Sequence, residues 1–255
     1  MKYGKIAEGR FVERPNRFVA RVELDGQIET VHVKNTGRCR ELLLPGAVVY
    51  LEESDNPNRS TAYDLVAVKK GERLINMDSQ APNKAVGEWL RAGGLFEDVV
   101  LVKPEARYGN SRIDFYVETE HEKIFIEVKG VTLEKDGVVR FPDAPSERAV
   151  KHVQELVEAK RAGYRVFVLF VVQMEGVEYF APNRRMHPMF AERLCEAAEK
   201  GVEVLAYDCR VTPDSMEINT PVEVYLKENL QEGIADESWE NSSKHGQEAE
   251  KFGKS

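Results

Sequence analysis

The sequence has few cysteines, no long apolar run and no excess of positive charge. Its three cysteines, Cys39, Cys195 and Cys209, form no C-x-x-C pair, and their odd number argues against a disulfide framework. The longest apolar run, residues 166–172, is far shorter than the roughly 20 residues that span a bilayer. The first residues contain no apolar signal core. These absences predict a cytoplasmic protein that does not cross a membrane.

Acidic residues outnumber basic ones, 44 to 36, so the formal net charge is −8. Because nucleic-acid-binding domains are typically basic, this balance argues weakly against such a function. The negative charge is unevenly distributed along the chain, since residues 1–80 carry 13 basic and 12 acidic side chains. The chain also lacks a G-x-x-x-x-G-K-[ST] loop and a histidine pair at zinc spacing, so neither a P-loop nor a common zinc motif is present.

Residues 1–80 are expected to form a small β-barrel domain. The dipeptide Asp25-Gly26 lies between two stretches of β-forming residues, which is a strong hairpin signal. Several short strands in about 80 residues indicate a barrel or sandwich. We predict an oligonucleotide-binding (OB) barrel, although the pattern alone also allows an SH3-like barrel. The expected strands are residues 17–24, 28–33, 47–52 and 62–69.

Residues 81–226 are expected to form a second domain with a mixed sheet flanked by helices, an α/β (α+β) fold. The continuous apolar run 165–173 is typical of a strand inside a sheet. Ser146 is expected to cap a helix that Gly163 ends. Residues 227–255 are polar and are expected to be a disordered tail. The other expected elements are a short helix within residues 81–96 that Gly93-Gly94 ends, helices 146–162 and 188–200, a buried strand 97–103, a loop 107–110 and a strand 202–207.

A β-hairpin within residues 111–132 carries the most informative side chains. Its strands, 113–117 and 123–128, are rich in β-branched and aromatic residues, and the polar residues 118–122 separate them. If the turn is centred on residues 120 and 121, Asp114 lies opposite Glu127, with Cβ atoms about 4.5–5.5 Å apart. Lys129 shares their face, whereas Ile124, Ile126 and Val128 point toward a core.

Two carboxylates held so close repel each other unless a cation lies between them. Hard oxygen ligands suit Mg²⁺ or Mn²⁺, and an ammonium such as that of Lys129 can orient a water for phosphodiester hydrolysis. The alternative is a solvated hairpin face, which the flanking apolar strand disfavours. Glu88, in the helix 81–96, is either a third metal ligand or a solvated side chain. The Val128 carbonyl is a further expected ligand.

Basic residues recur around the barrel strands and again near the hairpin. Arg38 and Arg40 follow the turn 35–37 and are the best barrel candidates for phosphate contacts. Phe11 and Phe18 are more simply explained as barrel core than as base-stacking groups. In the helix 146–162, Arg148, Lys151 and His152 lie close together at spacings of three and four. These three side chains and Arg112 are the remaining candidates for nucleic-acid binding.

The hairpin resembles the PD-(D/E)xK nuclease superfamily, with Asp114 and the run 127–129 in the places of that pattern and Ile113 in place of its proline. The chain as a whole resembles the sugar fermentation stimulation protein A family over residues 9–226. The motifs that carry this resemblance are His32-x-x-Asn35-Thr36-Gly37-Arg38, Leu43-x-Pro45-Gly46, Pro82-Asn83, Ser111-Arg112-x-Asp114-Phe115, Glu127-Val128-Lys129-Gly130-Val131-Thr132, Phe141-Pro142-Asp143-Ala144, Lys151-His152 and Ala181-Pro182-Asn183. The family usually has Arg-Gly where this chain has Arg148-Ala149.

The resemblance implies an OB-like domain, a nuclease-like domain, DNA binding and a history as a bacterial regulator of sugar metabolism. Two hypotheses follow. The first is a Mg²⁺- or Mn²⁺-dependent deoxyribonuclease, and the second is a catalytically silent DNA-binding regulator on a nuclease scaffold. RNA stays open as the partner, because a barrel binds single strands of either kind. A homodimer is also open, since nucleases that cut both strands of a duplex often pair.

Overall fold

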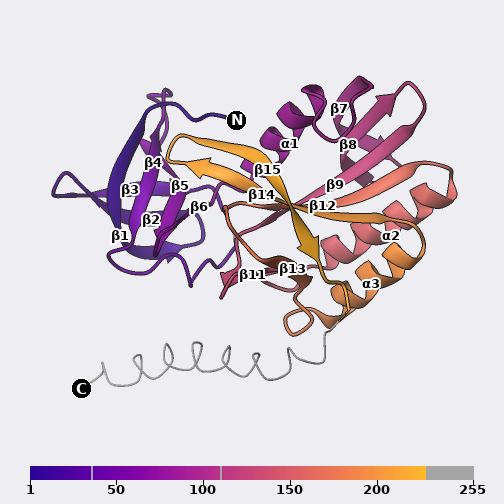
Figure 1. Ribbon diagram of the computed structural model, residues 1–255. Helices are drawn as coiled ribbons and strands as arrows, with labels where there is room; N and C mark the ends of the chain where they lie inside the picture. Colours follow the sequence, from indigo (N-terminus) through magenta and orange to yellow (C-terminus); the bar gives the residue numbers. More distant parts are fainter. Residues whose placement is uncertain (36, 110, 228–255) are drawn as a thin grey trace.

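The computed structural model describes residues 1–35, 37–109 and 111–227. It has two parts, a small barrel at the N-terminus and a larger layered part that holds the three described helices (Figure 1). The expected tail, residues 227–255, lies outside the described residues except for Lys227. None of the helices within the described ranges is long and apolar enough to cross a bilayer.

Five strands, β1 to β5, close into a barrel. The strand order of the sheet is β3-β2-β1-β4-β5-β6, a parallel pairing of β3 with β5 closes the ring, and β6 adds to β5 outside it. This closed five-stranded barrel confirms the OB-like expectation. Two strands, β1 and β6, were not expected from the pattern. The strands are β1 Ile6–Asn16, β2 Val19–Leu24, β3 Gln27–Val33, β4 Val48–Glu53, β5 Tyr63–Lys70 and β6 Arg73–Asn76.

Local sequence explains how the barrel strands are joined and packed. Asp25 and Gly26 both have positive φ, 51° and 78°, the backbone that a two-residue hairpin between twisted strands requires. Alternate residues of β2, Ala20 and Val22, are fully buried, and Phe11 of β1 joins them in the core. The expectation that Phe11 is core is therefore confirmed. Phe18 is different, because it is 45% exposed.

The larger part is a nine-stranded mixed sheet between helices, as expected. The strand order is β10-β11-β13-β15-β14-β12-β9-β8-β7. The strands are β7 Val99–Tyr108, β8 Ser111–Thr119, β9 Lys123–Val131, β10 Glu134–Lys135, β11 Val138–Phe141, β12 Arg165–Val172, β13 Tyr179–Pro182, β14 Glu203–Thr212 and β15 Ser215–Val224. The helices are α1 Ala81–Arg91, α2 Glu147–Arg161 and α3 Pro188–Glu199. The strands β10, β11, β13 and β15 were not expected.

The central strand β12 is buried on both faces, which explains its continuous apolar sequence. It pairs in parallel with β9 on one side and with β14 on the other. Its residues 166, 168, 170 and 172 pack with α2 and α3, and residues 167, 169 and 171 pack with α1. Covering both faces in this way removes a parallel strand from water and favours an unbroken apolar run.

Two expectations for this part need correction. The run 97–103 was expected to be a buried strand, but β7 is the last strand of the sheet and leaves Val100 67% and Leu101 43% exposed. An edge strand has only one neighbour, and apolar composition alone does not reveal this. Arg107 and Tyr108, expected in a loop, continue β7 and pair with β8. Helix α1 ends at Arg91, and Gly93 has φ 81° just beyond it, in agreement with the expected end at Gly93-Gly94.

Polar contacts fix the barrel against the larger part. The Nε2 atom of Gln173, just after β12, donates to the Asn76 carbonyl and side-chain oxygens at 3.1 and 3.0 Å and to the Asp78 carbonyl at 3.1 Å. A Cβ atom on Gly130 would lie 2.5 Å from Gln173 Oε1, so only glycine fits beside this amide. Glu134, 5% exposed, binds Lys70 and Arg73 of the barrel at 2.7 and 2.5 Å.

Candidate active site

The hairpin of β8 and β9 brings two carboxylates together. The paired residues run from Phe115 with Ile126 to Glu118 with Lys123, which is the register expected from the sequence. The ladder ends at the pair of Phe115 with Ile126; one further step in the same register would set Asp114 opposite Glu127, and Asp114 Oδ2 accepts from the amide of Val128, the next residue. Ile124, Ile126 and Val128 are buried on the α1 side, as expected, so Glu127 and Lys129 face α2.

Hydrogen bonds hold Asp114 in place, but its surroundings disfavour the charged form of its carboxyl group. Its Oδ2 accepts from the Val128 amide at 2.8 Å, and its Oδ1 accepts from Asn83 Nδ2 at 2.8 Å. Burial raises the pKa of the Asp114 carboxyl, and the neighbouring charge of Glu127 raises it further. The hydrogen bonds offset these effects only in part. Asp114 is therefore a carboxylate for which a nearby cation would be favourable.

Glu127 is almost fully buried, with 2% of its side chain exposed. Its Oε1 accepts from Lys129 Nζ at 2.6 Å and is also bonded to His152 Nδ1. Burial alone would raise the pKa of Glu127, but the bonds from His152 and Lys129 outweigh burial and hold this pKa below its ordinary value. Glu127 is thus an ionised carboxylate inside the protein.

The second oxygen of Glu127 differs from the first. Glu127 Oε2 is buried and has no hydrogen-bond partner among the residues that the structure describes. Leaving a buried polar atom unpaired is costly, so each such atom needs an explanation, and a missing ion is one of the usual ones. Hard carboxylate oxygens are the ligands that Mg²⁺ and Mn²⁺ prefer. Asp114 and Glu127 therefore fit a divalent cation by chemistry and by the unpaired oxygen.

A third acidic ligand does not join this pair in the structure. Glu88, the expected third ligand, binds the N-terminal ammonium of Met1 at 2.8 Å with a side chain that is 62% exposed. Within residues 1–35, 37–109 and 111–227, no three His, Cys, Asp or Glu side chains are arranged to hold a metal ion. Sequence reasoning placed Glu88 off the apolar stripe of its helix but could not foresee that the chain terminus binds it.

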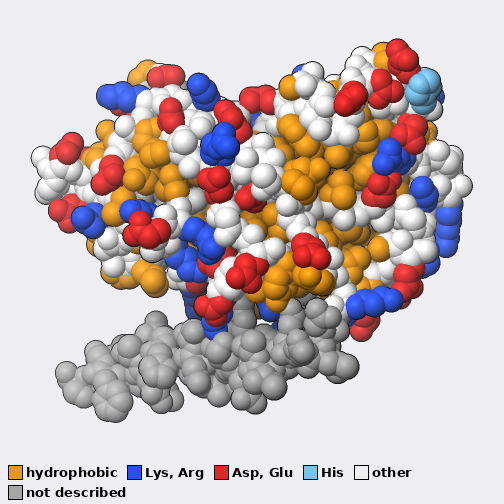
Figure 2. Space-filling model, in the orientation of Figure 1, with side chains coloured by type: hydrophobic (Ala, Val, Ile, Leu, Met, Phe, Trp, Pro, Cys, Tyr) orange, Lys and Arg blue, Asp and Glu red, His pale blue; other side chains and the backbone are white. Residues whose placement is uncertain are grey.

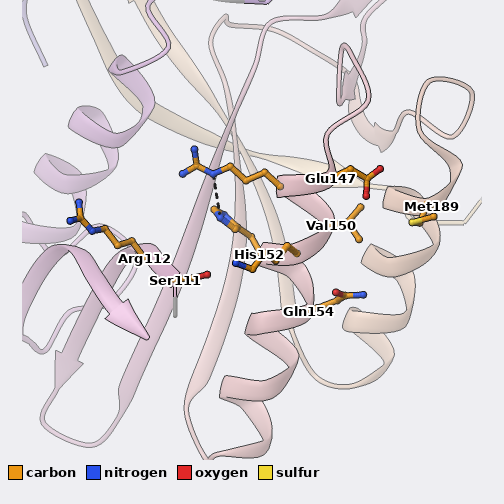
Figure 3. Close-up of a pocket in the computed structure, with 9 residues that line it drawn as sticks. Ser111, Arg112, Glu147, Val150, His152, Gln154 and Met189 are labelled. Carbon is orange, nitrogen blue, oxygen red and sulfur yellow. Dashed lines mark hydrogen bonds between the residues drawn. The ribbon is translucent and has the colours of Figure 1, made fainter. Parts of the chain in front are cut away.

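The expected phosphate-binding residues near the hairpin surround one open pocket of about 750 Å³ (Figure 3). Ser111 and Arg112 come from β8 and lie across from His152 of α2 (Figure 3). Arg148 and Lys151 of α2 line the same pocket. Arg112 is exposed beside Glu105, at 3.2 Å, and Lys151 lies 3.6 Å from Glu155. The structure thus collects four expected residues, Arg112, Arg148, Lys151 and His152, at one place.

His152 has a different position from the one expected of a phosphate contact. Its side chain is 9% exposed and its Nδ1 is bonded to Glu127. Arg148 Nε lies 3.4 Å from His152 Nε2, so a chain of contacts runs from the pocket wall to the buried carboxylate. The helix that carries both residues begins at Ser146, whose hydroxyl accepts from the Ala149 amide at 3.2 Å, as predicted. His152 therefore positions Glu127.

Sequence reasoning missed two side chains at this site. Asn83 donates to Asp114 from the first turn of α1, and its only signal in the sequence was the family motif Pro82-Asn83. Glu155 accepts from the Ser111 hydroxyl and has a buried, unpartnered Oε2. It lies one turn beyond His152 and Lys151 on α2, a spacing that could have indicated it.

The barrel arginines fall into two groups. Arg38 and Arg40 lie in the segment between β3 and β4, and both side chains are exposed. Arg14 instead donates to four carbonyl oxygens, those of Arg17, Asn35, Gly37 and Arg38, at 2.6–2.9 Å. On the face that Figure 2 shows, basic side chains lie among acidic ones and form no continuous patch. Any attraction for phosphate on this face is therefore local.

Comparisons with known proteins extend over both parts of the chain. Residues 12–77 match the family model described as SfsA N-terminal OB domain, and residues 80–215 match the one described as sugar fermentation stimulation protein RE domain. A sugar fermentation stimulation protein homolog of Clostridium beijerinckii is 56% identical over 226 residues, which cover 89% of this chain and 100% of that protein. Its homolog in Ruminiclostridium cellulolyticum is 57% identical with the same coverage.

A solved structure is similar as well. Pyrococcus furiosus SfsA in complex with Ca²⁺ superposes with a TM-score of 0.80 at 29% sequence identity, and the match covers 88% of this chain and 98% of that one. The family resemblance read from the motifs is confirmed by these matches, and so is the two-part fold.

Proposed function

The chain belongs to the sugar fermentation stimulation protein family, and from that premise and the geometry of the site we propose that it is a divalent-metal-dependent nuclease acting on DNA. The observation that carries the proposal is the buried, unpartnered Oε2 of Glu127 beside the strained carboxylate of Asp114. The Pyrococcus furiosus relative was solved in complex with Ca²⁺, a cation that also takes oxygen ligands. That relative supports a divalent-cation site in the present chain, and we propose Mg²⁺ or Mn²⁺ as the working ion.

Asp114 and Glu127 would hold the ion, which when bound supplies Lewis-acid polarisation of a phosphodiester oxygen. Asn83 and the Val128 amide hold Asp114 in place, and His152 holds Glu127. Lys129, 13% exposed and 2.6 Å from Glu127, orients the attacking water. The chain's contribution is thus a set of prepositioned groups rather than a covalent intermediate.

Arg112, Arg148 and Lys151 would bind the phosphates next to the scissile bond, because they line the pocket beside His152. Arginine suits this role through its bidentate geometry, and lysine through its compact charge. Arg38 and Arg40 would contact phosphates on the barrel. Since no continuous basic patch is visible on the face in Figure 2, these local clusters have to supply most of the electrostatic attraction.

One observation favours a second function, a catalytically silent DNA-binding regulator. Glu127 Oε1 already bonds to Lys129 and His152, and Glu88 is bound to Met1 rather than to the pair. A scaffold that had lost its metal could keep such a set of polar contacts. The two functions differ in whether a cation binds and whether DNA is cut.

The deciding experiment measures thermal stability and DNA cleavage with Mn²⁺, Mg²⁺ or EDTA on single-stranded, duplex and branched DNA. A nuclease should be stabilised by millimolar Mn²⁺, by about 2.7 kcal/mol when the ion is at a hundred times its Kd. Asp114→Asn and Glu127→Gln should lose both the stabilisation and cleavage, and should keep DNA binding. Lys129→Met should keep the stabilisation and lose cleavage.

Glu120→Gln, in the exposed turn of the same hairpin, is the matched control and should behave like the wild type. A wild-type chain that shows neither a thermal shift with Mn²⁺ nor cleavage of any DNA form would leave the silent regulator as the better account.

A further inference from the structure

An exposed aromatic ring lies on the barrel near the place where the two parts of the molecule meet. Phe18 occupies the two-residue turn between β1 and β2 and is 45% exposed, although composition favoured a place in the core. The guanidinium of Arg17 lies over this ring, 4.7 Å from its centroid. An exposed ring beside a cation is the equipment with which proteins stack and hold an unpaired nucleotide.

Hydrogen bonds fix the backbone that carries the ring. Asn16 Oδ1 accepts from the amides of Phe18 and Val19 at 2.9 and 3.1 Å, and the Phe18 carbonyl accepts from the Val33 amide at 2.8 Å. Both peptide groups of Phe18 are therefore fixed in the folded protein. A turn that is already ordered has no backbone entropy to lose when a ligand binds.

The surroundings of Phe18 connect it to the loop arginines of the barrel. The guanidinium of Arg14 binds the carbonyl of Arg17 on one side and those of Gly37 and Arg38 on the other. Arg17, Phe18 and Arg38 therefore form one surface, which we call the Phe18 surface. It combines one π-face with two cations, the combination that binds a base together with its flanking phosphates.

The Phe18 surface adjoins the segment that leads to the proposed active site. A Cβ atom on Gly37 would lie 2.8 Å from Asp143 Oδ2, so the loop of Arg38 touches the residues just before α2. Helix α2 begins after Ser146 and carries Arg148, Lys151 and His152 into the pocket. The Phe18 surface is therefore connected through the loop of Arg38 to the segment that leads into α2.

We propose that Phe18 is a stacking platform for an unpaired base, so that the substrate is DNA with a single-stranded segment next to the position that the site acts on. The inference rests on the proposed function and deepens it, because it names the strand state of the substrate. A base inside a duplex has both faces covered by its neighbours and is not available to the ring, whereas an unpaired base is.

The test measures binding of a fluorescent oligo-dT and of a duplex of equal length by anisotropy, in EDTA so that neither metal nor cleavage enters. Phe18→Leu keeps an apolar side chain but removes the π-face, and should weaken oligo-dT binding about tenfold, the loss of one base stack of about 1.4 kcal/mol. Duplex binding should change less than about twofold. Phe18→Tyr should restore oligo-dT binding.

Ile28→Ala is the matched control. Ile28 is 57% exposed and belongs to the same barrel, but it lies at the other end of the β2–β3 hairpin, so its removal should leave oligo-dT binding unchanged. Equal losses for oligo-dT and duplex, no loss with Phe18→Leu, or a wild type that does not bind oligo-dT would each overturn the inference.

The outcome is separable from that of the proposed function. Binding of oligo-dT through Phe18 by a chain that never cleaves would refute the nuclease and leave the platform standing. Metal-dependent cleavage that is unaffected by Phe18→Leu on every DNA form would support the nuclease and refute the stacking platform.

Discussion

In metal-free protein, replacing the two site carboxylates should have different effects on stability. Glu127 accepts from Lys129 at 2.6 Å and from His152 inside the protein, whereas Asp114 carries a raised pKa because it is buried next to Glu127. Glu127→Gln should therefore destabilise the fold. Asp114→Asn should leave stability unchanged or increase it.

The size of the effect follows from the contacts. A hydrogen bond to a charged group contributes about 1.5–3 kcal/mol, and a neutral amide retains roughly half of such a bond. With two bonds weakened, Glu127→Gln should cost about 1.5–3 kcal/mol, or roughly 3–12 °C in Tm for a chain of this size. For Asp114→Asn the loss of one acceptor and the relief of repulsion offset each other to within about 1 kcal/mol, since Asn83 can reverse its amide to accept from the new side chain.

The stability changes caused by Glu127→Gln and Asp114→Asn should also depend on pH in different ways. The pKa of Glu127 is lowered in the folded protein, so its contribution is present above the ordinary carboxyl pKa of about 4.3 and is lost as pH falls through the folded value. The deficit of Glu127→Gln should therefore be largest near neutral pH and shrink in acid. The pKa of Asp114 is raised, so its ionisation costs stability as pH rises, and the advantage of Asp114→Asn should grow toward neutral pH.

Urea unfolding in EDTA at neutral pH and at a pH below about 4.3, the ordinary carboxyl value, measures both effects, with Glu120→Gln as the control on the same hairpin. If Glu127→Gln is as stable as this control, the buried ion pair with Lys129 and His152 does not form. If Asp114→Asn loses as much stability as Glu127→Gln, the hydrogen bonds from Asn83 and Val128 outweigh the repulsion, and the strain assigned to Asp114 is wrong.

Three further predictions concern the barrel, the interface and α2. Replacing both Arg38 and Arg40 by alanine should weaken DNA binding and flatten its salt dependence, by about 0.9 in the log–log slope for each lost duplex phosphate contact; an unchanged slope in a salt titration would remove this loop from the interface. Glu134→Gln should cost roughly 2 kcal/mol in urea unfolding, because it weakens the bonds from Lys70 and Arg73. These cations outweigh burial and lower the pKa of Glu134, so the cost should diminish in acid. An equal loss of stability at neutral and at acidic pH would contradict this. Ser146→Ala should remove the cap of α2 and cost about 1 kcal/mol, whereas Ser146→Asp should keep it; equal Tm values for Ser146→Ala and wild type would show that the cap contributes nothing.

The sequence by itself determined the local features of this protein. The turn at Asp25-Gly26, the cap at Ser146 and the register that sets Asp114 opposite Glu127 each depend on residues near one another in the chain, whose backbone preferences and side-chain alternation can be read directly. The buried strand 165–172 was predictable for the same reason, because its apolar run leaves no face for water. The family followed from motifs in collinear order.

Only the tertiary structure decided what depends on distant segments. Glu88 binds the chain terminus, His152 turns inward to Glu127, and Phe18 stays outside the core, and no local pattern states which remote group each side chain will meet. The exposed edge strand β7 has the same cause, because apolar composition does not tell how many neighbours a strand will have. The unpaired Oε2 of Glu127 likewise appears only when β8, β9 and α2 are packed together, since burial and the lack of a partner are properties of the assembled fold.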